Sequence, residues 1–331
     1  MPSLAGKPIT QNGLGLMRMT LKGDVVSDEK AFPVLKAALA ASVNVWNGAD
    51  FYGTTDCNSL HLMKRYFTAY PEDAEKVVLT IKSGIADMNT FAMDGSPAAI
   101  RGFVDRANTI LDGKKKLDLF GLGRVDKKVP IEDSVRALGD LVAEGKIGGI
   151  QMSEVSADTI RRAAKVAKID MVEAEISLWA TDVFENGVAE TCAELGITMV
   201  AHSPLGAGML TGQIKSPDDL PVNDYHRIFP RFQPENFAVN VQLVEKLKAI
   251  ATQKGCTPAQ LALSWVKAQS TLPRMPVIVP VAGARSEERI RENATEVTLS
   301  AEDLREIKAV LDSFPVVGGR YPAEAATLLE Y

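Results

Sequence analysis

Short apolar runs alternate eight times with amphipathic helical segments, which predicts an α/β fold, a single (β/α)8 barrel spanning residues 1–331. The length of 331 residues fits such a barrel with insertions, and no stretch reads as a linker between domains. The main alternative, an open doubly wound sheet, would need a GxGxxG motif directly after a strand, and the sequence contains none.

The expected elements follow one another in the order that the barrel requires. The eight strands are expected at 13–17, 43–46, 76–83, 117–123, 148–153, 169–177, 197–204 and 276–283. The helices between the first seven strands are expected at 29–42, 59–67, 96–113, 130–146, 157–167 and 186–196. Three of these helices have sequence start signals: Asp28, Ser96 followed by Pro97, and Ser156.

The last third of the chain exceeds what a plain barrel needs. A Gly/Pro-rich connection over 205–236 precedes two helices, at about 237–254 and 258–269. Two further helices, "SEERIRENA" and "SAEDLREIKAVLDSF", follow the eighth strand. We expect the remaining C-terminal tail, after Phe314, to lie over the barrel mouth, the end where the strands finish.

Composition excludes several classes of partner. The net charge is −5 and no basic block appears, so neither nucleic acid nor an anionic membrane is an expected partner. No apolar stretch reaches the roughly 20 residues of a membrane span, and the N-terminus carries no apolar signal region. Cys57, Cys192 and Cys256 are far apart, which predicts a reduced cytoplasmic protein without disulfides. His202 stands alone at its strand end, so no metal site is expected.

Polar residues follow the second and third expected strands, at the end of a barrel where chemistry collects. Asn47, Asp50 and Tyr52 lie in "WNGADFYG", and Lys82 ends "VVLTIKSG". A lysine beside a tyrosine favours the phenolate, so Tyr52 could protonate a developing alkoxide. Lys82 could instead be a snorkelling surface residue or form a Schiff base. Without a metal or a covalent nucleophile, carbonyl reduction needs an external hydride donor, a nicotinamide cofactor.

The ends of the seventh and eighth strands suit such a cofactor. The stretch 203–212, "SPLGAGMLTG", can approach a pyrophosphate closely, although a flexible loop would have the same composition. The stretch 283–293, "GARSEERIREN", places Arg285, Arg289 and Arg291 near a helix N-terminus, where guanidinium groups bind phosphate. These arginines could equally form a solvated helix face, paired with glutamates of the same helix.

Nearly the whole chain, from Gly13 to Phe314, resembles the aldo-keto reductase family. The resemblance rests on the order and spacing of "ADFYG", "VVLTIKSG", "LDLFGLGRVD", "AEISLW", "AHSPLGAGMLTG", "PVIVPVAG" and "ERIRENA". It implies a (β/α)8 barrel that uses NADPH to reduce aldehydes and ketones. The segments "WNGADFYG", "SEVSADTIRRA" and "GGRYPAEAATLLEY" are most similar to the fungal pyridoxal reductases, which implies reduction of pyridoxal to pyridoxine.

The family's Asp, Tyr, Lys and His tetrad is matched only in part. Tyr52 and Lys82 match the acid and its partner, whereas the Asp falls on Asn47 and the His on Gly123. Asn47 could accept a hydrogen bond from Lys82 but would leave its charge uncompensated. Asp50 could restore that charge or be a simple turn residue. The missing side chain at Gly123 is expected to open space for a bulky pyridine aldehyde.

The resemblance also implies a set of cofactor contacts. They are Ser153, Glu173, His202, Ser203, Pro204, Leu205, Gly206, Gly208, Gly283, Arg285, Arg289, Glu292 and Asn293. Ser153 and Glu173 would face the carboxamide, with Glu173 in place of a usual Gln. His202 would either stack on the nicotinamide or be a buried structural histidine. Glu154 stands where many members have Asn. The Gly-rich stretch would line the pyrophosphate. Arg285 and Arg289 would hold the 2′-phosphate, and Glu292 and Asn293 would contact the adenine.

Two alternatives remain open at this point. One is a reductase of broader aldehyde and ketone specificity, and the other is a non-catalytic NADPH-binding regulatory subunit. The departures at Asn47 and Gly123 favour the second alternative, and the retained Tyr52 and Lys82 oppose it. Contacts to a small-molecule aldehyde are expected in Asp87–Met93, Arg124–Lys128, the 213–236 loop and the C-terminal tail.

Overall fold

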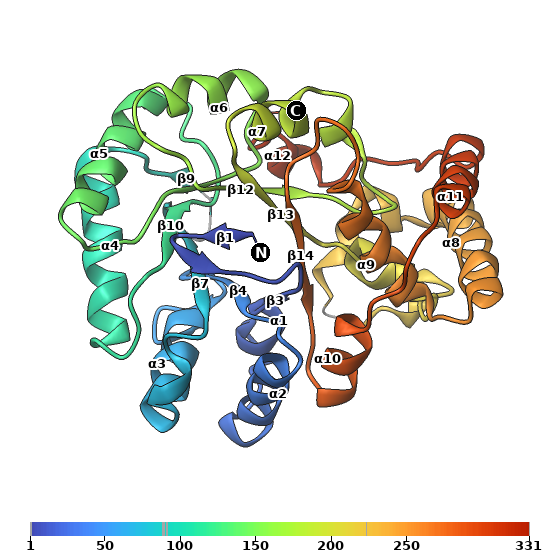
Figure 1. Ribbon diagram of the computed structural model, residues 1–331, viewed down its shortest axis with the longest axis horizontal. Coiled ribbons are helices and arrows are strands. Elements are labelled where there is room, and N and C mark those ends of the chain that lie inside the picture. Colours follow the sequence, from blue (N-terminus) through green and yellow to red (C-terminus); the bar gives the residue numbers. More distant parts are fainter. Residues whose placement is uncertain (1, 88–89, 91, 223, 331) are drawn as a thin grey trace.

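The computed structural model describes residues 2–87, 90, 92–222 and 224–330. A ring of strands lies at the centre, with helices arranged around it (Figure 1). Met88, Asn89 and Phe91, in the expected substrate segment Asp87–Met93, lie outside the described residues.

Eight parallel strands form the predicted barrel. They are β3 (Gly13–Gly15), β4 (Val45–Ala49), β7 (Val78–Ser83), β10 (Leu119–Leu122), β11 (Gln151–Ser153), β12 (Met171–Glu175), β13 (Thr198–His202) and β14 (Ile278–Gly283). Their order in the sheet is β10-β7-β4-β3-β14-β13-β12-β11. A parallel bridge between Phe120 and Ile150 joins the two edges, so the expected fold class is confirmed.

The helices agree with the sequence pattern, with small shifts at their ends. They are α1 (Met17–Thr20), α2 (Asp28–Ala40), α3 (Ser59–Ala69), α4 (Pro97–Leu111), α5 (Ile131–Ala143), α6 (Ala157–Ala164), α7 (Val188–Glu194), α8 (Pro234–Lys254), α9 (Pro258–Gln269), α10 (Glu287–Ala294), α11 (Ala301–Ser313) and α12 (Ala323–Ala326). The Ser96 and Ser156 hydroxyls cap α4 and α6 as predicted. Asp28 was expected as a cap but is the first helical residue, after Ser27. The first strand ends earlier than expected, at Gly15, because α1 begins at Met17.

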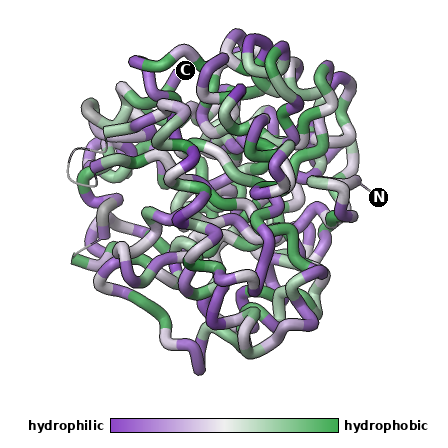
Figure 2. Tube along the Cα trace, turned by 90° about the vertical axis from the view of Figure 1, so that its left-hand side faces the viewer, coloured by the Kyte–Doolittle hydropathy of each residue, from purple (hydrophilic) through white to green (hydrophobic). Residues whose placement is uncertain are grey.

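The 205–236 connection was expected to be irregular, and much of it consists of short 3-10 turns. These are η3 (Gly206–Thr211), η4 (Pro217–Asp219), η5 (Tyr225–Ile228) and η6 (Pro230–Phe232). No helix of the described residues is long and apolar enough to cross a membrane. Hydrophilic and hydrophobic residues are interspersed along the trace (Figure 2).

The barrel interior changes from apolar to polar along the strands. An N-terminal hairpin of β1 (Ser3–Leu4) and β2 (Lys7–Pro8), which the sequence did not predict, lies across the centre of the ring (Figure 1). Its Leu4 packs in an interior apolar cluster that includes Val45 and Met171, the first residues of β4 and β12. Alternate residues of a strand share a face. Asn47 and Glu173 therefore point inward one layer further along, and the polar interior lies at the carboxyl ends.

Candidate active site

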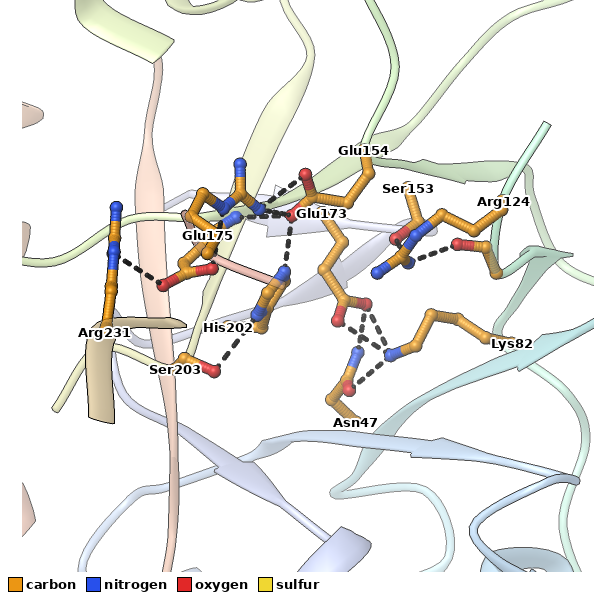
Figure 3. Close-up of polar contacts among 12 residues, drawn as sticks. Asn47, Lys82, Arg124, Ser153, Glu154, Glu173, Glu175, His202, Ser203 and Arg231 are labelled. Atoms are coloured by element: carbon orange, nitrogen blue, oxygen red, sulfur yellow. Dashed lines mark hydrogen bonds and ion pairs between the residues drawn. The ribbon is translucent and has the colours of Figure 1, made fainter. Parts of the chain in front are cut away.

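Lys82 is the centre of a buried polar cluster inside the barrel (Figure 3). Its Nζ donates to Asn47 Oδ1 at 2.8 Å and to both carboxylate oxygens of Glu173 at 2.7 Å. Asn47 Nδ2 in turn donates to Glu173 Oε2 at 2.8 Å and to Thr80 Oγ1 at 3.0 Å. The side chains of Lys82 and Glu173 are only 3% and 2% exposed, so they form an ion pair shielded from water.

The carboxylate partner of Lys82 comes from a strand that is not adjacent to its own, since β10 and β11 lie between β7 and β12. Asn47 lies on β4 and Glu173 on β12, and three strands separate these two in either direction around the ring. The expectation of an uncompensated Lys82 is therefore wrong. Asp50 does not supply the charge either, since its carboxylate accepts from Ser83 Oγ at 2.6 Å and Arg106 Nη2 at 3.2 Å.

The protonation states of this pair follow from two opposing effects. Burial alone lowers the pKa of Lys82, but the Glu173 carboxylate and the neighbouring Tyr52 outweigh burial and raise it above its ordinary value. Burial likewise raises the pKa of Glu173, but the charge of Lys82 leads the effects that bring it below its ordinary value. Lys82 is therefore a cation and Glu173 an anion at neutral pH.

Tyr52 is the half-buried residue that faces this cation. It lies three residues beyond β4, and Lys82 Nζ is 5.3 Å from the centre of its ring. The structure thus brings Asn47, Tyr52 and Lys82 together at one end of the barrel. The expected space at Gly123 is absent, because a Cβ there would lie 3.0 Å from the ring of Phe51. Phe51 fills the volume that a larger residue at Gly123 would need.

A second buried network joins the strand ends to the C-terminal tail. Glu154 is fully buried and accepts from His202 Nε2 at 2.6 Å. Arg320 Nη2 donates to both Glu154 oxygens at 2.7 Å, and Arg320 Nε donates to Glu175 Oε2 at 2.8 Å. Burial raises the pKa of Glu154, but His202 and Arg320 more than reverse this effect. The tail therefore lies over the barrel mouth, as expected, and is held there by an ion pair inside the protein.

The residues expected to contact the carboxamide and the nicotinamide ring are already hydrogen-bonded to other side chains. Glu173 binds Lys82 and Asn47, and Ser153 Oγ accepts from Arg124 Nη1 at 3.4 Å. His202 is held by Glu154 and lies 3.3 Å from Ser203 Oγ through its Nδ1. Glu154 and Arg320, which the sequence did not assign, thus control the orientation of the imidazole ring.

The Gly-rich turn after β13 has a left-handed backbone conformation. Gly206, Ala207 and Gly208 all have positive φ, at 55°, 55° and 100°. Gly208 and Leu210 donate their N–H groups to the Leu205 carbonyl, which keeps the turn tight beside buried Pro204. The two glycines lack side chains, so a phosphate group could approach the backbone of this turn closely.

The segment after β14 supplies the positively charged side chains that a phosphate group would need. Arg285 donates to Asp24 at 2.6 and 2.9 Å, and Arg289 donates to Glu292 at 2.5 Å. Their side chains are 44% and 42% exposed, so a phosphate could reach both. Exposed Gly283 precedes them. Asn293 lines a small pocket with Asn12, near the amino ends of the strands. The turn and the two guanidinium groups fit a dinucleotide with a 2′-phosphate.

Comparisons with known proteins agree with this architecture. The model of the aldo/keto reductase family matches residues 13–312. Probable pyridoxal reductase 2 of Schizosaccharomyces pombe is 36% identical over 338 residues, with 99% of each chain covered. Aldo-keto reductase yakc of the same yeast, whose name specifies NADP(+), is 35% identical and covers 95% of this chain and 92% of its own. The solved glycerol dehydrogenase of Gluconobacter oxydans has a TM-score of 0.80 at 21% identity, with 95% and 94% covered.

The chain therefore belongs to the aldo/keto reductase family. Membership confirms the expected class of enzyme, a reductase of aldehydes or ketones, and is consistent with NADPH as its cofactor. The glycerol dehydrogenase supports the fold alone, because its sequence identity is low.

Proposed function

We propose that this protein is an NADPH-dependent reductase that converts pyridoxal, the aldehyde form of vitamin B6, to pyridoxine. The observation that carries the chemistry is the buried Lys82–Glu173 pair beside Tyr52 at the strand ends. The observation that favours pyridoxal is the full-length similarity to a probable pyridoxal reductase. A cytoplasmic setting is part of the proposal, because Cys57, Cys192 and Cys256 are free.

Each residue of the cluster has a separate task in this proposal. NADPH, when bound, supplies the hydride that the carbonyl carbon accepts. Tyr52 donates its hydroxyl proton to the carbonyl oxygen, and the Lys82 cation stabilises the phenolate that remains until water returns a proton. Glu173 and Asn47 hold Lys82 in place and keep it charged. The turn at Gly206–Gly208, with Arg285 and Arg289, holds the phosphates.

The test is the loss of NADPH absorbance when pyridoxal is added to the purified protein. We expect steady turnover, with pyridoxine as the product by chromatography. Turnover of other aldehydes but not of pyridoxal would replace the proposed substrate and leave a broader aldehyde and ketone reductase. Tight NADPH binding without turnover of any aldehyde would instead support a regulatory, non-catalytic subunit.

Removal of either phosphate-binding arginine should change the choice of cofactor. Arg285→Ala or Arg289→Ala should weaken NADPH binding by about 10- to 100-fold, because each deletes a charge-assisted contact to the 2′-phosphate. Binding of NADH, which lacks this phosphate, should change little. Dissociation constants from fluorescence titration with both cofactors measure the effect.

A matched control lies on the same helix. Arg291 pairs with Glu287 at 2.7 Å and is 64% exposed, so Arg291→Ala should leave both affinities unchanged. Equal binding of NADPH and NADH by the unmodified protein would contradict the assignment of both phosphate-binding arginines.

A further inference from the structure

One cation at the barrel mouth has no ion-pair partner in the part of the chain that the structure describes. Three acidic residues pair with three basic ones in the polar networks of Figure 3. The pairs are Lys82 with Glu173, Arg320 with Glu154 and Glu175, and Arg231 with Glu175 at 3.7 Å. Arg124 is a fourth cation, and no carboxylate of the described residues lies within 4.0 Å of it. Arg124 is therefore a cation of these networks that has no ion-pair partner among the described residues.

Arg124 is held at its place without being neutralised. It lies two residues beyond the end of β10, and its Nη1 donates to the Gly123 carbonyl at 2.6 Å and to Ser153 Oγ at 3.4 Å. These contacts use one of the three guanidinium nitrogens, and the N–H groups of Nε and Nη2 have no acceptor among the described residues. The side chain is half-buried, so the unused donors are partly withdrawn from water.

Aromatic rings of two separate segments lie beside this cation. The guanidinium carbon is 6.0 Å from the centre of the Tyr321 ring in the C-terminal tail. The Tyr321 ring lies 5.4 Å from that of Phe229, in the 205–236 connection. A flat substrate that enters beneath the tail would thus meet both an aromatic surface and a positive charge.

We propose that Arg124 binds an anionic oxygen substituent of the substrate, so that the enzyme selects aromatic carbonyl compounds that carry a phenolate, carboxylate or phosphate group. A guanidinium with two free nitrogens binds such oxygens through paired, charge-assisted hydrogen bonds. Pyridoxal fits this class, since it has an ionisable ring hydroxyl beside its aldehyde. The inference rests on the proposed reductase function and adds a substrate class to it.

The experiment compares charged and neutral forms of one aldehyde. The 2-, 3- and 4-carboxybenzaldehydes and their methyl esters are tested with saturating NADPH, in the unmodified enzyme and in Arg124→Gln and Arg124→Lys. We expect at least one acid to have a kcat/KM about 10- to 100-fold above its ester, the ratio that one charge-assisted contact provides. Arg124→Gln should abolish this ratio and Arg124→Lys should keep most of it. The control is Arg101→Gln. Arg101 lies on the outer helix α4, and its charge is paired with Glu144.

A binding measurement separates this inference from the proposed function. The matching hydroxymethylbenzoate cannot be reduced further, so calorimetric titration into the NADPH-bound enzyme reports affinity alone. It should bind about 10-fold or more tightly to the unmodified enzyme than to Arg124→Gln. Equal kcat/KM for acids and esters, with equal affinities for both proteins, would overturn the anion site and leave the reductase intact. Absence of all turnover would refute the reductase function, and the titration would still decide the anion site.

Discussion

Tyr52→Phe should lower kcat/KM for the reduction of aldehydes by NADPH by about 10²- to 10⁴-fold, the range that a positioned general acid contributes. The change removes one hydroxyl and keeps the ring, which lies beside the Lys82 cation. The affinity for NADPH should stay within about twofold, because the hydroxyl acts on the carbonyl oxygen and binds no part of the phosphates. Initial rates of absorbance loss, with a fluorescence titration of NADPH, measure the two quantities.

Tyr70→Phe provides a matched control. Tyr70 caps the C-terminus of α3, which returns toward the amino ends of the strands, and its ring packs on Phe32 and Tyr66. Its hydroxyl is remote from the barrel mouth, so this variant should retain full activity. Residual activity above about one tenth in Tyr52→Phe would show that another group or water protonates the alkoxide.

The sequence was sufficient for those parts of the site that lie at the ends of neighbouring strands. Strand alternation and the polar residues at strand ends predicted the barrel, and they selected Tyr52 and Lys82 as neighbours at its mouth. Asn47 was also found this way, because β4 and β7 are adjacent strands, with Ala49 paired to Lys82 in their register.

The parts that escaped prediction depend on distances across the barrel. Glu173 reaches Lys82 across the barrel interior from a non-adjacent strand, and its position depends on strand order, register and side-chain length together. Arg320 joins Glu154 over a separation of 166 residues, and no periodicity marks such a pair. Phe51 occupies the space beside Gly123 through the path of a loop. One sequence signal was present: a glutamate in the middle of an apolar strand should have suggested a buried cation as its partner.

Glu173→Gln should destabilise the protein by about 3–5 kcal/mol, the cost of leaving a buried charge without its partner. Asn47 would then be the main remaining acceptor for the Lys82 ammonium, and only Tyr52 would still oppose the effect of burial, which lowers the pKa of Lys82. Loss of that cation should also reduce kcat/KM by about 10²-fold, since the phenolate of Tyr52 is no longer stabilised. Urea unfolding and steady-state kinetics measure the two effects.

A second substitution should reverse both losses. Asn47→Asp in the Glu173→Gln background places a carboxylate where Asn47 Oδ1 now lies, 2.8 Å from Lys82 Nζ. Asn47→Asp alone should be harmful, because its new oxygen would face Glu173 Oε2 across a contact that is 2.8 Å long in the present protein. Each single variant should therefore be less stable and less active than the double variant. Independent, additive losses would show that the carboxylate of Glu173 does not act through Lys82.

The stability difference between the unmodified protein and Glu173→Gln should depend on pH, and this dependence identifies the charge of Glu173 as its cause. The pKa of Glu173 is lowered in the folded protein, chiefly because Lys82 overcomes the effect of burial. Its stabilising contribution is thus present above the ordinary value of 4.5 and is lost as the pH falls through the lower folded value. The gap in unfolding free energy between the unmodified protein and Glu173→Gln should be full at pH 7. It should begin to shrink below about pH 4.5, where Glu173 is protonated in the unfolded chain, and close once folded Glu173 is protonated and resembles glutamine. A gap that stays constant from pH 7 to pH 3 would mean that packing, and not the ion pair, explains the loss.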